Sequence, residues 1–286
     1  MKSNNPVFAR TEEFNRASTN AYGNQTYPGG SSVQGSSDPS TWGTGTPTDE
    51  RSGGRMTIDS VVQATGISLA VVMVTAAITW WFIGDVAAGN GFVNEDNYQR
   101  AIALMTIGSL GAFGLSMVNS FKRVVSPPLV LLFAAVEGVA LGALSKFFES
   151  YAGAGVVTGA VVGTFAAFAG TLAAYKIFNI QVGQKFRIFV VAAMFGMVGL
   201  GLLSFVLSMF GVTTGLFGFG TLGLVMAVVG LVLGIFMLIL DFDYVENGIA
   251  AGLPERESWR AAFGLTVSLV WIYTNLLRIL AIFSQD

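Results

Sequence analysis

The stretch "LVLGIFMLILDFDYVENG", Leu231 to Gly248, joins a long apolar run to a cluster of acids. Its first ten residues carry no charge, and Asp241, Asp243 and Glu246 then follow within six positions. Such a run is typical of a transmembrane helix, because a helix that rises about 1.5 Å per residue needs roughly 20 apolar residues to cross the hydrocarbon. The stretch therefore predicts a membrane span that carries acids at one end.

The composition of the whole chain favours a polytopic membrane protein. Hydrophobic residues make up 53% of the 286 residues and charged residues only 11%, whereas about a quarter of the residues in soluble domains are charged. The net charge of -2 argues against a nucleic-acid partner. Cysteine and histidine do not occur in the sequence, so we expect no disulfide, no cofactor and no metal site with fixed ligands.

The sequence divides into a polar N-terminal segment and an apolar remainder. Residues 1–56 are rich in Ser, Thr, Gly, Asn and Pro, and we expect them to form a disordered cytoplasmic tail because they cannot bury enough apolar surface. Residues 57–286 predict an all-α, seven-helix transmembrane domain. The seven apolar stretches are residues 61–83, 101–121, 129–147, 153–176, 188–210, 217–241 or a turn beyond, and 261–283.

Basic residues indicate the orientation, since Lys and Arg gather on the cytoplasmic side of a membrane. The set near the predicted cytoplasmic helix ends is Arg51, Arg55, Lys122, Arg123, Lys176, Lys185, Arg187, Arg256 and Arg260. Only Arg100, Lys146 and Arg278 fall near the outer ends. We therefore expect an integral multi-pass protein of the plasma membrane, with its N-terminus inside and its C-terminus outside.

Proline and glycine mark helix ends and helix contacts. Pro127-Pro128 suits the start of the third span and Asn247-Gly248 the end of the sixth. Small residues four apart let helix backbones approach closely in lipid. Such rows are Gly138 and Gly142; Gly155, Gly159 and Gly163; and Gly230 and Gly234. Packing inside the bundle is their expected use, and homodimerisation is the alternative.

Glu137 and Arg278 are charged residues inside the predicted spans. Glu137 lies near the bilayer midplane, where an ionised carboxylate costs roughly 2.5 to 3.5 kcal/mol on insertion scales. It is therefore expected to face the bundle interior, either as a structural hydrogen-bonding group or as a pathway residue linked to proton movement. Arg278, toward the outer end of the last span, has three open roles: snorkelling, pairing with Glu149, or pairing with the C-terminal carboxylate.

Asp241 is the candidate for a proton sensor or gate at the cytoplasmic mouth. Successive helical residues are about 100° apart, so Asp241 and Asp243 point to different faces and cannot form a facing pair. Asp243 shares the rim-side face with Glu246. We expect Asp241 to be the buried acid, where burial and the helix C-terminus both oppose its ionised form. The alternative is a polar helix end at the membrane surface.

The order of these features resembles the Bax inhibitor-1 family. The resemblance covers about residues 57–283 and rests on seven spans, "ILDFDYV" at the end of the sixth and "NLLRIL" in the last. "NPVF" near the N-terminus and "VEGVALGALS" at residues 136–145 are similar to the actinobacterial branch, which implies a bacterial protein. The resemblance implies a bundle with a central last helix, and a pH-sensitive leak of cations, chiefly calcium.

The resemblance also implies a pair of gating residues. In studied members an Asp of the sixth helix and an Asp of the seventh form a pH-responsive latch. Matching "ILDFDYV" and "NLLRIL" puts these positions at Asp241 and Ser268. The Ser268 hydroxyl can donate a hydrogen bond to Asp241, but the coupled titration of two acids is expected to be lost. Glu137 and Asp243 are alternative partners.

The sequence leaves three functions open. The first is a pH-modulated passive calcium leak, closed at the cytoplasmic mouth by Asp241, Asp243 and Ser268. The second is a proton-coupled secondary transporter that uses Glu137, and the third a non-transporting regulator that binds a membrane protease or another membrane partner. We find no convincing internal repeat, which favours the leak over the transporter. No catalytic pattern occurs, so an enzyme is not expected.

Overall fold

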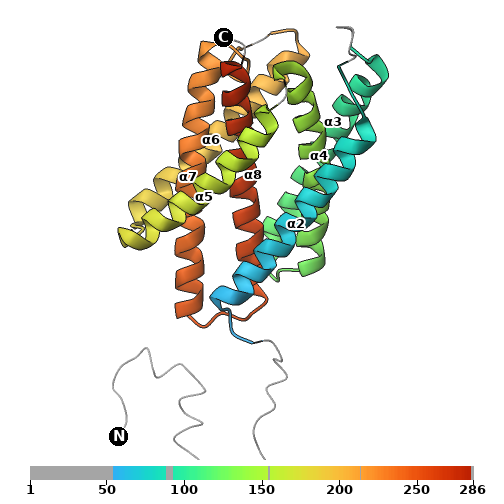
Figure 1. Cartoon of the computed structure of the whole chain (residues 1–286). Coiled ribbons are helices and arrows are strands. Elements are labelled where there is room, and N and C mark those ends of the chain that lie inside the picture. Colours follow the sequence, from blue (N-terminus) through green and yellow to red (C-terminus); the bar gives the residue numbers. More distant parts are fainter. Residues whose placement is uncertain (1–53, 88–92, 154, 213, 285–286) are drawn as a thin grey trace, which may run out of the picture. The chain divides into compact units, whose positions relative to one another are not determined.

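The computed structural model describes residues 54–87, 93–153, 155–212 and 214–284. Seven of its helices are long and apolar enough to cross a membrane, and the described residues form no strand. In chain order they are α2 (Ile58–Ile83), α3 (Glu95–Phe121), α4 (Pro127–Ala152), α5 (Val156–Ile177), α6 (Gln184–Met209), α7 (Thr221–Ala250) and α8 (Glu257–Phe283) (Figure 1). The chain is thus an all-α, multi-pass membrane protein. Of the predicted tail, residues 1–53 lie outside the described residues.

Helix α7 differs most from its prediction. It begins at Thr221 and continues to Ala250, so the predicted exit at Asn247-Gly248 is wrong. The left-handed glycine that follows the helix is Gly252, with a φ of 65°, a conformation that glycine adopts without a steric penalty. Asp241 consequently lies about 14 Å from the end of its helix, at about 1.5 Å per residue.

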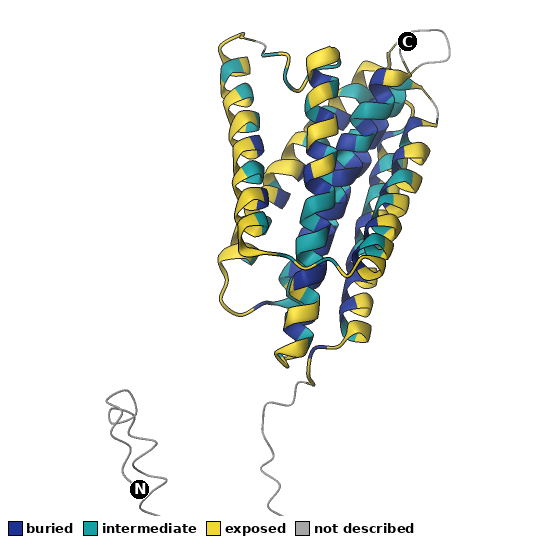
Figure 2. Cartoon of the chain, turned by 90° about the vertical axis from the view of Figure 1, so that its left-hand side faces the viewer, coloured by how far each residue is buried: buried dark blue, intermediate teal, exposed yellow. Residues whose placement is uncertain are grey.

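The last helix, α8, lies between two groups of helices. It packs against α2 and α4 on one side and against α5 and α7 on the other. Figure 2 shows that buried residues gather along the inner faces of the bundle. The central position of the last helix, which the family resemblance implies, is therefore confirmed.

The outer faces of the helices are strongly apolar. The side chains of Trp81 and Phe121 are 83% and 82% exposed. Soluble proteins rarely expose apolar surface on this scale, whereas lipid tails solvate it well. The exposed faces therefore identify the lipid bilayer as the environment of the bundle.

The end of the bundle at which α2 and α8 begin is termed the basal end. There the Met56 backbone N–H donates a hydrogen bond of 2.8 Å to the Leu253 carbonyl oxygen. The hydroxyls of Ser60 and Ser258 lie 2.7 Å apart. These contacts hold the start of α2 against the connection between α7 and α8. The basal end is the predicted cytoplasmic end.

The glycine rows pack inside the bundle. Gly138 and Gly142 lie against α2, while Gly159, Gly163, Gly230 and Gly234 lie against α8. Gly155 is the exception, because it precedes α5 with a φ of 102° and has open space around it. The expected packing role is therefore confirmed for six of the seven glycines, while homodimerisation stays a prediction.

Gly142→Ala is expected to destabilise the bundle by about 1–3 kcal/mol, the usual cost of overpacking a well-packed interior. A Cβ at Gly142 would meet the Ala76 backbone of α2, with the Cα at 2.9 Å. Gly114→Ala is the matched control, because nothing lies within 4 Å of a Cβ there. Thermal unfolding in detergent micelles measures both variants. Equal unfolding temperatures would contradict the close approach of α2 and α4.

Candidate functional site

A polar cavity of about 960 Å³ lies at the basal end, beside the last turns of α7. Helix α5, the connection between α5 and α6, α6 and α7 line it. Its charged and polar side chains are Tyr175, Asn179, Gln181, Arg187, Asp241, Asp243, Tyr244, Glu246 and Asn247. This cavity is termed the vestibule. It brings all three acids of the opening stretch to one site.

The two outer acids of the vestibule each join α7 to a different helix. Arg187 Nη2 of α6 donates to Asp243 Oδ2 at 2.7 Å. The Tyr175 hydroxyl of α5 donates to Glu246 Oε2 at 2.7 Å. Both acids thus belong to contacts that hold α5 and α6 against the end of α7.

Asp241 lines the vestibule and also touches the central helix. The Ser268 hydroxyl of α8 donates to Asp241 Oδ2 at 2.5 Å. One turn earlier, a Cβ at Gly264 would come within 3.0 Å of Asp241 Oδ1. Gly264 therefore leaves space for this carboxyl group, and the Ser268 hydroxyl binds it. The contact between Asp241 and Ser268 is the one that the sequence predicts.

The burial of Asp243 differs from the prediction. Asp243, expected at the rim, is only 8% exposed, while Asp241 is half-buried, with its carboxyl group against Gly264 and Ser268 of α8. The reason is that α7 runs on to Ala250, so Asp243 still lies within the bundle, where Arg187 of α6 covers it.

Glu137 makes no hydrogen bond or ion pair with another acid's partners among the described residues. Phe133, one turn before it on α4, meets Phe263 of α8 edge-on, with 5.0 Å between ring centroids. Asp241 instead reaches α8 from α7, through Ser268. No hydrogen bond or ion pair joins the two carboxyl groups in the described part of the chain. Neither Glu137 nor Asp243, which bonds to Arg187, takes the place of the second acid.

A second group of charges lies at the opposite end of the bundle, around Lys146. This side chain is buried, and its ammonium lies 3.3 Å from Asp85 Oδ1 and 3.0 Å from Glu149 Oε2. The ammonium also lies 4.5 Å from the centre of the Trp80 ring, which adds a cation–π attraction. The sequence placed Lys146 near this end but did not reveal its partners.

Arg278 does not pair with Glu149, whose carboxylate bonds to Lys146 instead. Its Nη2 donates to the Gly223 carbonyl oxygen at 3.3 Å, and its guanidinium carbon lies 5.3 Å from the centre of the Phe217 ring. The predicted pairing of Arg278 with Glu149 is therefore wrong. The other predicted partner, the C-terminal carboxylate, lies outside the described residues.

A family model described as Bax inhibitor 1 like matches residues 5–285. The chain belongs to the Bax inhibitor 1 like family. A search among curated proteins finds no match. The match includes the polar N-terminal segment from residue 5, with all of "NPVF" at residues 5–8, as well as residues 57–283.

Sequence reasoning missed Arg187 and Tyr175 in this Bax inhibitor 1 like protein. Their partners lie 56 and 71 residues away along the chain. The available signal was indirect: Asp243 and Glu246 share one face of a helix and need donors. Arg187 begins a neighbouring span, but nothing in the sequence distinguishes it from Lys185 as the partner.

Proposed function

We propose that this protein is a pH-modulated passive cation leak of the plasma membrane, chiefly for calcium, closed at its basal, cytoplasmic mouth by contact between α7 and α8. The observation that carries the proposal is the hydrogen bond from Ser268 to Asp241. It joins an ionisable group on the wall of an open polar cavity to the central helix of the bundle. A change in the charge of Asp241 thus acts directly on the contact between α7 and α8.

The charges around the vestibule favour cations over anions. Asp241, Asp243 and Glu246 contribute three carboxyl groups to its lining, and Arg187 contributes one guanidinium. A cavity with an excess of one sign of charge raises the local concentration of ions of the opposite sign. The vestibule therefore suits the capture of a cation such as calcium at the basal end.

An apolar layer is the proposed barrier between the vestibule and the interior of the bundle. Leu238 of α7 and Leu265, Leu269 and Ile272 of α8 are buried in one cluster beside Asp241. A hydrophobic constriction stops ions when it is dry, since nothing in it replaces their hydration shell. In this proposal the dry layer keeps the leak closed, and opening requires water between α7 and α8.

Ionisation of Asp241 favours the opening of this layer. A carboxylate beside apolar side chains is stabilised by water, while a protonated carboxyl group tolerates a dry site. Ser268 supplies one hydrogen bond, and water completes the solvation of a charged Asp241. The leak is therefore expected to increase as the pH rises and Asp241 loses its proton.

Calcium entry into liposomes that hold the purified protein tests the proposal. A calcium-sensitive dye inside the vesicles reports entry from about pH 5 to about pH 8, the range in which a perturbed carboxyl group titrates. We expect flux above that of protein-free vesicles, and more flux at higher pH. If no pH yields flux above protein-free vesicles, the leak is excluded and a regulator that binds a membrane partner becomes the better proposal.

A proton-coupled transporter is the second candidate, because Glu137 lies inside the bundle and its carboxyl group has no hydrogen bond within the described residues. Glu137→Gln distinguishes the two mechanisms. A passive leak through the α7–α8 contact continues in this variant, while a transporter that carries its proton on Glu137 stops. Proton movement that follows calcium in the wild type, and is lost in Glu137→Gln, would favour the transporter.

A further inference from the structure

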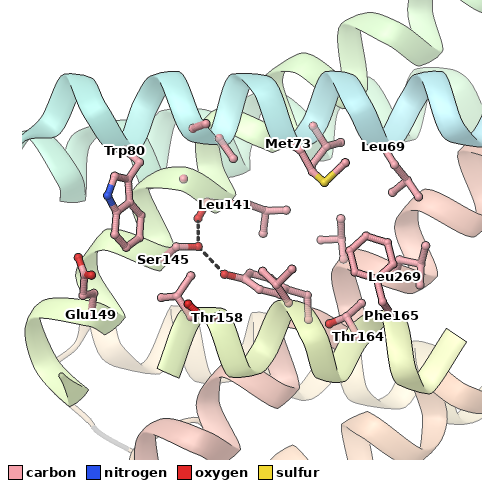
Figure 3. A pocket seen from close by; sticks show the side chains of 18 of the residues that line it. Leu69, Met73, Trp80, Leu141, Ser145, Glu149, Thr158, Thr164, Phe165 and Leu269 are labelled. Carbon is pink, nitrogen blue, oxygen red and sulfur yellow. Dashed lines mark hydrogen bonds between the residues drawn. The ribbon is translucent and has the colours of Figure 1, made fainter. Parts of the chain in front are cut away.

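A second cavity, of about 460 Å³, lies on the other side of α8 from the vestibule acids, among α2, α4, α5 and α8 (Figure 3). Helices α2 and α5 make no contact with each other among the described elements. Met73 of α2 and Val161 of α5 line the cavity and are 50% and 38% exposed. The cavity therefore opens between α2 and α5 toward the surrounding lipid.

Three hydroxyl groups that line this cavity, those of Ser145, Tyr273 and Thr164, already have hydrogen-bond partners. Ser145 Oγ donates to the Leu141 carbonyl oxygen at 2.6 Å and lies 2.6 Å from the Tyr273 hydroxyl. Thr164 Oγ1 donates to the Ala160 carbonyl oxygen at 2.7 Å. The remaining walls are mostly apolar. Such a lining accepts hydrocarbon while Ser145, Tyr273 and Thr164 keep their hydrogen bonds.

One end of the cavity is polar and carries a net negative charge. Figure 3 shows Trp80 and Glu149 at this end, opposite Leu69. Glu149 lines the cavity and pairs with Lys146, which also pairs with the exposed Asp85 just outside the lining, so two carboxylates face one ammonium beside this end. Tryptophan is typical of the interface between lipid headgroups and hydrocarbon. This end therefore suits a headgroup that brings a positive charge.

The length of the cavity matches one leaflet of a bilayer. Along α2 its lining runs from Leu69 to Trp80, which is about 16 Å at about 1.5 Å per residue. Half of the hydrocarbon core is about 15 Å thick. The cavity thus extends from a membrane interface at Trp80 to about the middle of the bilayer, as an acyl chain does.

We propose that this cavity binds one acyl chain of a phospholipid whose headgroup carries a primary amine, with the chain between α2 and α5 and the amine beside Glu149 and Asp85. Its volume, about 460 Å³, falls within the range of roughly 300–1,000 Å³ of ligand pockets. The binding is independent of ion flux and does not rest on the proposed leak.

Native mass spectrometry of the purified full chain tests this site, with phosphatidylethanolamine and phosphatidylglycerol of identical acyl chains as probes. We expect the wild type to retain the amine lipid through a detergent wash that removes loosely held lipid. Ala77→Phe, which fills the cavity from α2, is expected to lower retention about tenfold, or about 1.4 kcal/mol. Ala70→Phe is the matched control, since Ala70 is exposed on the same helix but does not line the cavity.

A second matched pair tests the opposite wall. Val161→Trp fills the cavity from α5, while the neighbouring Val162 is 62% exposed and lies outside the lining. We expect loss of the lipid in Val161→Trp and retention in Val162→Trp. Equal retention of the lipid by the two members of each pair would overturn the proposal. If one of the four variants does not fold, the other pair still provides the comparison.

Glu149→Gln tests the headgroup. It is expected to reduce the preference for the amine lipid over phosphatidylglycerol, because one of the two carboxylates is lost. Glu95→Gln, at the exposed start of α3, is the control. Equal binding of the two lipids by the wild type, or retention of a free fatty acid in place of either, would overturn the proposed occupant.

Discussion

Calcium flux through Asp241→Asn is expected to stay low and nearly constant from about pH 5 to about pH 8, because an amide cannot ionise in this range. Asn at this position keeps the size of the side chain and still accepts a hydrogen bond from Ser268. The apolar layer beside it then has no charge that draws in water. At the upper end of the range we expect at least about tenfold less flux than in the wild type, a difference of about 1.4 kcal/mol.

Two further variants show whether this effect belongs to Asp241. Asp59→Asn removes an exposed acid in the first turn of α2 at the same end of the bundle and is expected to keep the wild-type pH dependence. Ser268→Ala leaves the carboxyl group but removes its donor, so flux is expected to rise several-fold while the pH dependence remains. A pH response in Asp241→Asn equal to that of the wild type would exclude Asp241 as the gate.

The seven helices could be predicted from the sequence because spanning length and hydropathy are local properties. The end of α7 could not, since the polar sequence after Asp241 looks like a membrane exit. The helix nevertheless continues to Ala250, and its acids form hydrogen bonds with residues of α5, α6 and α8. Contacts with other helices therefore decide the end of this helix, as tertiary context often overrides local signals.

The contacts of the candidate site could be predicted only where the family motifs showed which residues of two helices face each other. The resemblance placed Ser268 opposite Asp241, and the structure shows that hydrogen bond. The pairs of Arg187 with Asp243 and of Lys146 with Asp85 join residues that are 56 and 61 positions apart. Such pairs depend on the tilt and rotation of whole helices, which packing sets and hydropathy does not reveal.

Arg187→Glu is expected to increase calcium flux about tenfold, equivalent to about 1.4 kcal/mol, because the ion pair that holds α6 against α7 becomes a repulsion. The side chain of Asp243 is only 12% exposed. Removing one partner of a buried ion pair costs about 3–5 kcal/mol. The Arg187 side chain is 51% exposed, so the cost here is smaller, but like charges now face each other in the vestibule.

A variant in which Arg187 and Asp243 exchange their charges distinguishes the effect of their ion pair from the effect of the net charge of the vestibule. The double variant Arg187→Asp with Asp243→Arg is expected to return flux toward the wild-type level, since it restores an attraction between α6 and α7. Lys185→Glu makes the same change of charge two residues away, at a position that does not line the vestibule, and is expected to leave flux nearly unchanged. If Lys185→Glu increases flux as much as Arg187→Glu, the vestibule acts only through its overall potential. If the exchange fails to lower flux while both single variants fold, the pair does not hold the mouth closed, and closure then depends on Asp241 and Ser268 alone.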